Sequence, residues 1–250
     1  MNPLAPPRAA VDLGLLGGFR LTTGNEPVLV APAGQRLLAF LAVQKGPVQR
    51  AYAAASLWQD GTDTRACANL RSTLRRLPRP GGHALVDAGP THVRLPSGVD
   101  VDLWRAQAAV RVDDHDPADL HPDVALLQAD LLPEWDEDWL LAERERHRLL
   151  RLHALERLCA RHRERGSFDL AVQAGLAAVT SEPLRESAHR ALIEVHLAEG
   201  NHAEALRQYQ TYRVQLRAEL GLRPSPAIRS LVAHLLGRPA DAPTQGSRSW

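Results

Sequence analysis

Hydrophobic and polar positions divide the chain into a first part that mixes short strands with helices and a second part that is almost entirely helical. Residues 11–23 have strand character but are interrupted by glycines. A turn signal at residues 22–25 then leads to a short return strand, which we expect at residues 28–30.

Three helices are predicted after these strands. The first follows Pro32 and ends at Gly46-Pro47, because proline lacks the backbone N–H that a helix needs. The second spans residues 50–58, and the third has its most distinctive stretch at residues 69–77. The apolar positions of the third helix recur at the spacing of one buried stripe, and they are Ala66, Leu70, Leu74 and Leu77.

A hairpin is predicted after the third helix. Prolines and glycines at residues 78–82 end the helix, and residues 84–87 and 92–95 then flank a turn at residues 88–91 that contains glycine. The expected order over the first part is therefore strands, three helices and a hairpin.

The second part is predicted to be helical from Leu103 onward. A polar loop is expected at residues 113–122, a short apolar segment at 126–132 and an acidic turn at 133–138. A long amphipathic helix over residues 139–165 follows, and its charges alternate in sign, as on a solvated face.

An internal repeat occupies the last hundred residues. The stretch at residues 165–171 is matched by residues 199–205, with an offset of 34 residues between Gly166 and Gly200. This is the period of tetratricopeptide repeats, which contain two antiparallel helices per unit. Residues 227–236 are expected to close the array as a final helix.

Charge is distributed unevenly although the net charge is only +1. Residues 1–98 hold 11 Arg and Lys against 5 Asp and Glu, whereas residues 99–250 hold 19 against 24. The basic first part is therefore the part expected to contact a polyanion. Lys45 is the only lysine, so the abundance of arginine alone indicates little.

The third helix concentrates the candidate chemistry. Arg71 and Arg75 lie on one flank of its apolar stripe, and Arg65, Asn69, Ser72 and Arg76 on the other. No Asp or Glu occurs between Asp63 and Asp87. Arginine recognises guanine or phosphate, and asparagine recognises adenine. A solvated helix in an arginine-rich protein is the alternative that the helix alone leaves open.

Other chemistry is not indicated by the sequence. Cys67 and Cys159 lie in separate apolar helical patterns, which predicts reduced core residues. The 11 histidines show no metal-ligand spacing, and the carboxylates at residues 134–138 are interpreted as an exposed acidic turn. We expect no catalytic residues, no metal and no cofactor. No secretory signal or membrane span is found, so a cytoplasmic location is expected.

Several stretches of the sequence resemble those of a known family. The first part resembles a winged helix-turn-helix domain of the OmpR type, with the third helix as its recognition helix. The second part resembles the bacterial transcriptional activator domain in the stretches at residues 130–135, 143–146, 182–186 and 219–226. Together they resemble the Streptomyces antibiotic regulatory proteins. No ATPase or phosphopeptide module follows, as it does in larger relatives.

The resemblance implies a mainly α protein in four parts. These are a flexible leader at residues 1–10, a winged helix with a small sheet and hairpin wing at 11–98, a helical tetratricopeptide-like activator domain at 99–237, and a disordered tail at 238–250. It also implies a transcriptional activator that binds promoter direct repeats as a homodimer on double-stranded DNA. Such an activator recruits RNA polymerase through the sigma factor and alpha subunit, and controls a secondary-metabolite cluster.

The resemblance assigns roles residue by residue. The residues expected nearest the bases are Asn69, Arg71, Ser72 and Arg75. Phosphate contacts are expected from Arg65, Arg76 and Arg94, and the wing brings His92 to the DNA with Arg94. Asp60 and Asp63, beside a Trp58 expected in the core, are the polymerase candidates.

Two positions depart from the pattern of the family. Thr73 stands where an arginine is frequent, and Thr91-His92 stands where the wing often has Gly-Tyr. We expect Thr73 to affect which bases are selected. The alternative function is a tetratricopeptide-type interaction module whose winged helix does not bind DNA. An acid-free arginine face favours DNA.

Overall fold

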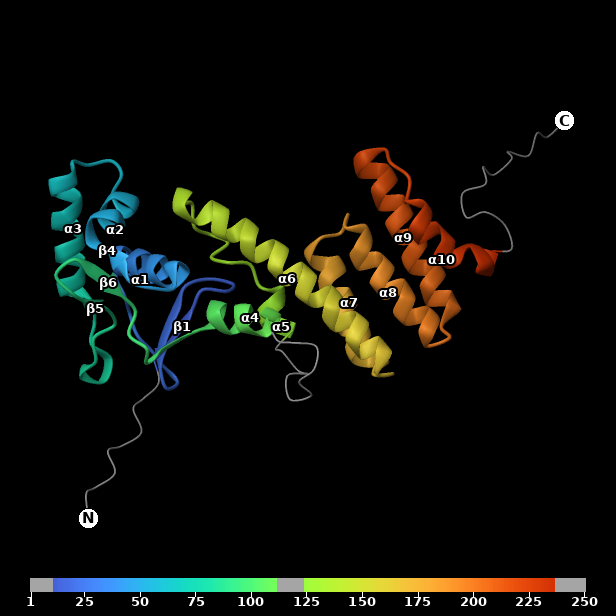
Figure 1. Ribbon diagram of the computed structural model, residues 1–250, viewed down its shortest axis with the longest axis horizontal. Coiled ribbons are helices and arrows are strands. Elements are labelled where there is room, and N and C mark those ends of the chain that lie inside the picture. Colours follow the sequence, from blue (N-terminus) through green and yellow to red (C-terminus); the bar gives the residue numbers. More distant parts are fainter. Residues whose placement is uncertain (1–10, 112–123, 237–250) are drawn as a thin grey trace, which may run out of the picture. The chain divides into compact units, whose positions relative to one another are not determined.

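The computed structural model describes residues 11–111 and 124–236, and the chain separates into two compact units, Met1–Arg148 and Leu149–Trp250 (Figure 1). The fold is mainly α, with two small sheets in the first unit and helices alone in the described part of the second. The predicted fold class is confirmed.

The first sheet has four strands in the order β3-β2-β1-β7. Its strands are β1 (Val11–Gly14), β2 (Arg20–Thr23), β3 (Glu26–Pro27) and β7 (Val99–Val101). The return strand lies at residues 26–27, so its predicted position at 28–30 was wrong by two residues. Strand β7 was not predicted; it pairs in parallel with β1, with Leu13 opposite Val101.

Three helices follow in the predicted order. They are α1 (Pro32–Gln44), α2 (Arg50–Leu57) and α3 (Asp63–Arg76). Helix α1 begins with proline at its first position and ends where Lys45 takes a left-handed φ of 54°, directly before Gly46-Pro47. Its apolar face is fully buried, because Leu37, Phe40 and their neighbours form the centre of the core.

The second sheet has three strands in the order β4-β6-β5. They are β4 (Val48–Gln49), β5 (Asp87–Ala88) and β6 (His92–Arg94), and a short 3-10 helix, η1 (Pro80–Gly82), precedes the hairpin. The predicted hairpin is present but shorter, since its ladder is limited to Asp87 opposite Arg94 and Ala88 opposite Val93. This hairpin is the wing.

The rest of the first unit packs onto the winged helix. It consists of α4 (Asp102–Arg111), α5 (Val124–Gln128) and the first part of α6 (Asp138–Glu164). Trp104 Nε1 of α4 donates to the carbonyl of Ala42 in α1 at 2.7 Å. Leu132 N donates to the carbonyl of Leu15 at 2.9 Å, although φ of Leu132 is positive. The loop predicted at residues 113–122 lies outside the described residues.

These contacts explain why the first unit continues to Arg148. Arg144 of α6 donates from Nε to the carbonyl of Leu131 at 2.9 Å, and also bonds to the carbonyls of Leu132 and Trp135. The ring of Trp135 stacks on Phe19 with centroids 6.0 Å apart. The division into compact units at Arg148 does not test the predicted boundary between the two functional domains at residue 98, which stays a prediction.

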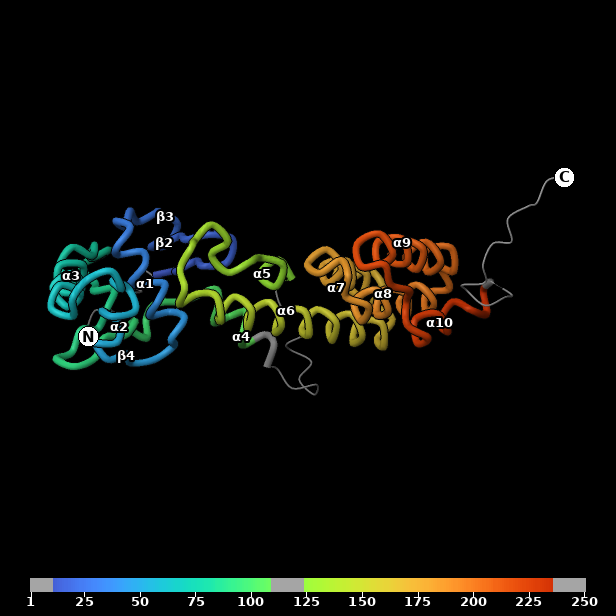
Figure 2. Tube along the Cα trace, turned by 90° about the horizontal axis from the view of Figure 1, so that it is seen from above, coloured from blue at the N-terminus to red at the C-terminus, as the bar shows by residue number. Residues whose placement is uncertain are grey.

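The second unit contains the repeat. Its helices are the end of α6, then α7 (Phe168–Ser181), α8 (Glu186–Ala198), α9 (His202–Leu220) and α10 (Pro226–Leu236). Gly166 and Gly200 both take positive φ, 73° and 81°, in the turns before α7 and α9. Helix α8 packs against α7 and α9, and α10 covers α8 and α9 (Figure 2). Tyr209 and Tyr212, at inner positions of the second repeat, are buried in this core.

Candidate nucleic-acid interface

The candidate interface is built on helix α3. Thr62 caps its N-terminus, where the side-chain oxygen accepts from the backbone N–H of Arg65 at 3.4 Å. Asp63 lies in the first turn, and Arg75 and Arg76 lie in the last turn. These charges stabilise the helix dipole at both ends. The sequence thus specifies a helix that begins six residues before the stretch at 69–77.

One side of α3 is packed against α1 and α2. Ala66 and Leu70 are buried there, as the stripe predicts, and Thr73 is buried with them at 7% exposure. Thr73 lies about 20° from the direction of Ala66 and about 60° from that of Leu70 when successive residues turn by about 100° around the axis. Its side chain is therefore on the packed side, a position that does not suit the expected role of Thr73 in base selection.

The opposite side of α3 is solvent-exposed and basic. Arg65, Arg71, Arg75 and Arg76 are exposed, whereas Asn69 and Ser72 are half-buried. Within residues 11–111 and 124–236, none of the four guanidinium groups has an ion-pair or hydrogen-bond partner. By contrast, Arg148 on α6 is paired with Glu145 at 2.8 Å. The α3 face therefore has free donors for an anion.

The wing lies in the same unit and exposes two further candidates. Arg94 and His92 alternate with buried Val93 on β6, so both point outward. Arg94 Nε lies 3.3 Å from Asp87 Oδ2, and the side chains are 60% and 48% exposed. An exposed pair of this kind contributes only about 0–1 kcal/mol, so it does not prevent Arg94 from binding another anion.

Arg50 holds the wing and was missed by the sequence reasoning. It opens α2, and its Nη1 donates to the carbonyl of Gly89 at the hairpin tip at 3.1 Å. Its backbone N–H also donates to the carbonyl of Thr91 at 2.8 Å. An arginine directly after a short strand was the available signal, but the partner strand could not be identified from spacing.

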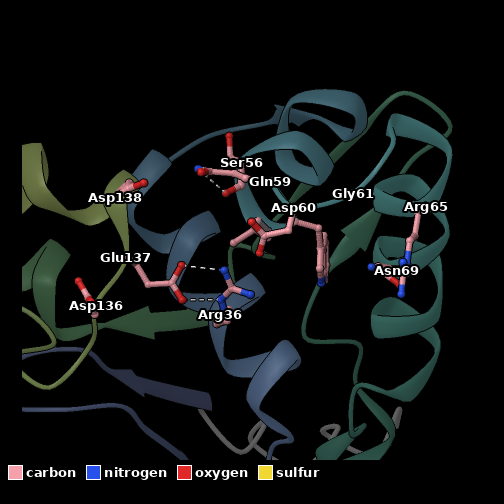
Figure 3. A pocket seen from close by; sticks show the side chains of 12 residues that line it. Arg36, Ser56, Gln59, Asp60, Gly61, Arg65, Asn69, Asp136, Glu137 and Asp138 are labelled. Atoms are coloured by element: carbon pink, nitrogen blue, oxygen red, sulfur yellow. Dashed lines mark hydrogen bonds and ion pairs between the residues drawn. The ribbon is translucent and has the colours of Figure 1, made fainter.

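The turn between α2 and α3 borders a polar cavity of about 500 Å³ (Figure 3). Asp60 lines it together with Trp58, Arg65 and Asn69, and Asp136 and Asp138 line its other side. Asp60 and Asp63 are both exposed, whereas Trp58 is only half-buried rather than a full core residue. The predicted polymerase candidates are thus accessible.

Glu137 corrects the interpretation of residues 134–138 as an exposed acidic turn. Its side chain is 16% exposed and forms an ion pair with Arg36 of α1, with Nε and Oε1 2.5 Å apart. Its Oε2 also accepts from Trp139 Nε1 at 2.8 Å. Glu137 is thus a structural link between α1 and the start of α6, whereas Glu134, Asp136 and Asp138 are exposed, as predicted.

Other site types find no support in the described part of the chain. No group of three or more His, Cys, Asp or Glu residues is gathered there as metal ligands. Cys67 and Cys159 are both free thiols. None of the described helices is long and apolar enough to cross a membrane.

Comparison with known proteins identifies the second part of the chain. Residues 99–236 match the family model of the bacterial transcriptional activator domain. A solved structure of EmbR from Mycobacterium tuberculosis, in complex with a low-affinity phosphopeptide, is similar over 93% of this chain with a TM-score of 0.63 and 23% identity. The chain spans 66% of that EmbR chain. No protein with a curated description matches the sequence significantly.

Proposed function

The chain belongs to the bacterial transcriptional activator domain family, and is of the Streptomyces antibiotic regulatory protein type. From that premise we propose that it is a sequence-specific, double-stranded-DNA-binding activator of transcription. The observation that carries the proposal is the exposed face of α3, where four arginines lack partners among the described residues. The family is one of transcription regulators, which agrees with this proposal.

In this proposal α3 enters the major groove and the wing approaches the neighbouring minor groove or its phosphates. The phosphate ligands are Arg65, Arg71, Arg75 and Arg76 on the helix, with Arg94 on the wing. His92 lies on the same exposed face of β6 as Arg94 and adds an imidazole ring to the wing. Arg50 supports the wing through the carbonyl of Gly89.

Electrostatics then sets the salt dependence of binding. Each phosphate contact contributes about −0.9 to the slope of log K against log salt concentration. Four to five arginine contacts should therefore give a slope of about −4 for one copy of the protein. No acid lies between Asp63 and Asp87, so the exposed face of α3 carries no carboxylate that would oppose this attraction from within the face.

RNA polymerase is the second proposed partner. The turn that contains Asp60 and leads to Asp63 is exposed beside the DNA-binding helix. Its carboxylates are suited to basic surfaces of the sigma factor or alpha subunit. Two copies would bind promoter direct repeats side by side, with the helical second unit stabilising the pair, in the cytoplasm where the chromosome lies. The controlled genes would be a secondary-metabolite cluster.

The direct test is recovery of bound DNA across the genome of the source bacterium, followed by a salt titration on the best site. Enriched promoter sites with direct repeats, and binding that weakens steeply with salt, are expected. No enriched site together with no salt-dependent binding would overturn the proposal. That result would instead favour an interaction module that binds protein through its tetratricopeptide-like helices.

A further inference from the structure

The exposed arginines of α3 form two pairs on either side of the helix. Measured around the axis from Thr64, Arg71 and Arg75 lie at about −20° and 20°, and Arg65 and Arg76 lie at about 100° and 120°. The buried residues Ala66, Leu70 and Thr73 lie at about 200°, 240° and 180°, on the packed side. The arginines therefore border the outward direction on both sides.

Ala68 and Ser72 occupy the space between the two arginine pairs. They lie at about 40° and 80° on the same scale, one helical turn apart. Ala68 is exposed and Ser72 is half-buried between its longer neighbours. The outward centre of the helix thus carries a methyl group and a hydroxyl group, and the long cationic side chains flank it.

Asn69 faces a different direction. It lies at about 140°, toward the packed side, and it lines the polar cavity with Asp60 and Arg65. Its amide is therefore placed at the edge of the exposed arc, beside the turn between α2 and α3. This position does not suit the base-reading role that the residue type suggests.

The dimensions of the DNA major groove indicate which residues of α3 contact phosphates and which contact bases. The major groove is about 12 Å wide, and a helix with its side chains is about 10–12 Å across. Long side chains on both flanks then meet the phosphates of the two groove walls, whereas short side chains at the centre let the backbone approach the base edges. Arginines at the flanks cannot reach inward without leaving the phosphates.

Resting on the proposed function, we infer that the two arginine pairs hold the phosphate walls and that Ala68 and Ser72 set the sequence preference. The Ala68 methyl contacts the 5-methyl group of a thymine, and the Ser72 hydroxyl donates to or accepts from an adjacent base. The readout at the centre is therefore a short-range contact with an A·T pair, without an arginine–guanine pair.

The experiment selects bound sequences from a random double-stranded DNA pool with the full chain, and then measures Kd on the selected site. Replacing the contacted thymine by deoxyuridine removes only its methyl group. One buried methyl corresponds to about a four-fold weaker affinity for the unmodified protein. Ala68→Gln should abolish this dependence and shift the preference at that position to adenine, because glutamine bonds adenine in a bidentate manner.

Ala218→Gln on α9 is the matched control, since Ala218 is also exposed on a helix. It should leave the selected sequence unchanged, and circular dichroism establishes that both variants are folded. The inference is overturned if Ala68→Gln selects the original sequence with unchanged affinities, or if Asn69→Ala rather than Ala68→Gln alters a base preference. Failure of the proposed function looks different, because the unmodified protein would then select no sequence at all.

Discussion

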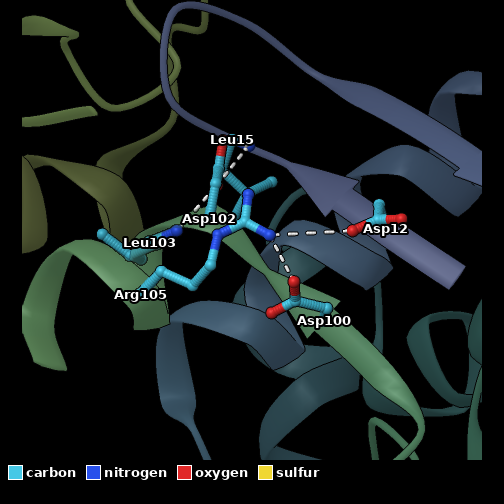
Figure 4. Close-up of polar contacts among 6 residues, drawn as sticks. All are labelled: Asp12, Leu15, Asp100, Asp102, Leu103 and Arg105. Carbon is cyan, nitrogen blue, oxygen red and sulfur yellow. Dashed lines mark hydrogen bonds and ion pairs between the residues drawn. The ribbon is translucent and has the colours of Figure 1, made fainter. Parts of the chain in front are cut away.

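Replacing Asp102 by alanine should destabilise the first unit by about 3–6 kcal/mol. The side chain is 2% exposed at the junction of β7 and α4. Its carboxylate accepts from the backbone N–H groups of Leu15 and Leu103 at 2.9 and 2.7 Å (Figure 4). It also accepts from the backbone N–H of Leu16 at 3.0 Å. It therefore joins the turn after β1 to the first helix of the activator region.

The magnitude follows from the groups that lose a partner. A buried donor left without an acceptor costs about 1–3 kcal/mol, and alanine leaves three such amides. Water entering the site lowers the sum, which gives the range of about 3–6 kcal/mol. A domain is stable by only about 5–15 kcal/mol, so the variant should be close to unfolding. Asp102→Asn keeps one acceptor oxygen and should lose about half as much.

Asp100→Ala, on the adjoining strand β7, is the matched control. The Asp100 side chain is 45% exposed and pairs with Arg105 at the surface, so its loss should cost less than about 1 kcal/mol. Urea unfolding followed by far-ultraviolet circular dichroism gives the midpoint and slope for each variant. Equal midpoints for the two alanine variants would refute the reasoning about Asp102.

Three further outcomes are expected. Arg50→Ala frees the hairpin tip at Gly89, so hydrogen exchange in the wing should accelerate while the thermal midpoint stays within a few degrees; unchanged exchange would refute the wing-holding role. Burial lowers the pKa of His189 below 6.5, so the unfolded chain binds the proton first, and the stability of the second unit should fall as pH drops through 6.5. His189→Gln should remove this fall in stability, which urea titrations at several pH values measure. The same pH dependence in His189→Gln and in the unmodified protein would contradict the role of His189. Burial raises the pKa of the Cys159 thiol to about 12, so a thiol reagent at pH 8 should label Cys67 alone until urea is added, and rapid native labelling of Cys159 would count against its burial.

Much of the fold could be predicted because its signals are local. Helix α1 is specified by Pro32 and Gly46-Pro47 at its two ends, and the repeat by the glycines that precede α7 and α9. These features depend on neighbours along the chain, and the structure confirms them. The buried pair Tyr209 and Tyr212 follows from the same periodicity.

The misses depended on partners far along the chain. Strand β7 has only three residues, and it is stabilised by parallel pairing with β1, which no local pattern encodes. No local pattern distinguishes Glu137 from the acids around it, because its partner Arg36 lies on α1, far along the chain. In the same way Arg50 depends on the carbonyl of Gly89.

In the candidate site, too, features that depend on local periodicity were predictable and those that depend on packing were not. Exposure of the arginines on α3 was predictable from helical periodicity, and the structure places Arg65, Arg71, Arg75 and Arg76 at the surface. The direction of each side chain relative to the packed side was harder to judge, since it requires knowing that Thr73 is buried. With Thr73 on the packed side, the residues that lie between the arginines on the exposed side are the small Ala68 and Ser72.

The most direct test of DNA binding by α3 is the salt dependence of Kd for the unmodified protein, Arg75→Ala and Arg223→Ala. Arg223 is exposed in the second unit and serves as the matched control for a lost charge. The account predicts a steep slope that Arg75→Ala flattens by about 1 and Arg223→Ala leaves unchanged. Binding that ignores salt, or the same slope for all three proteins, would contradict it.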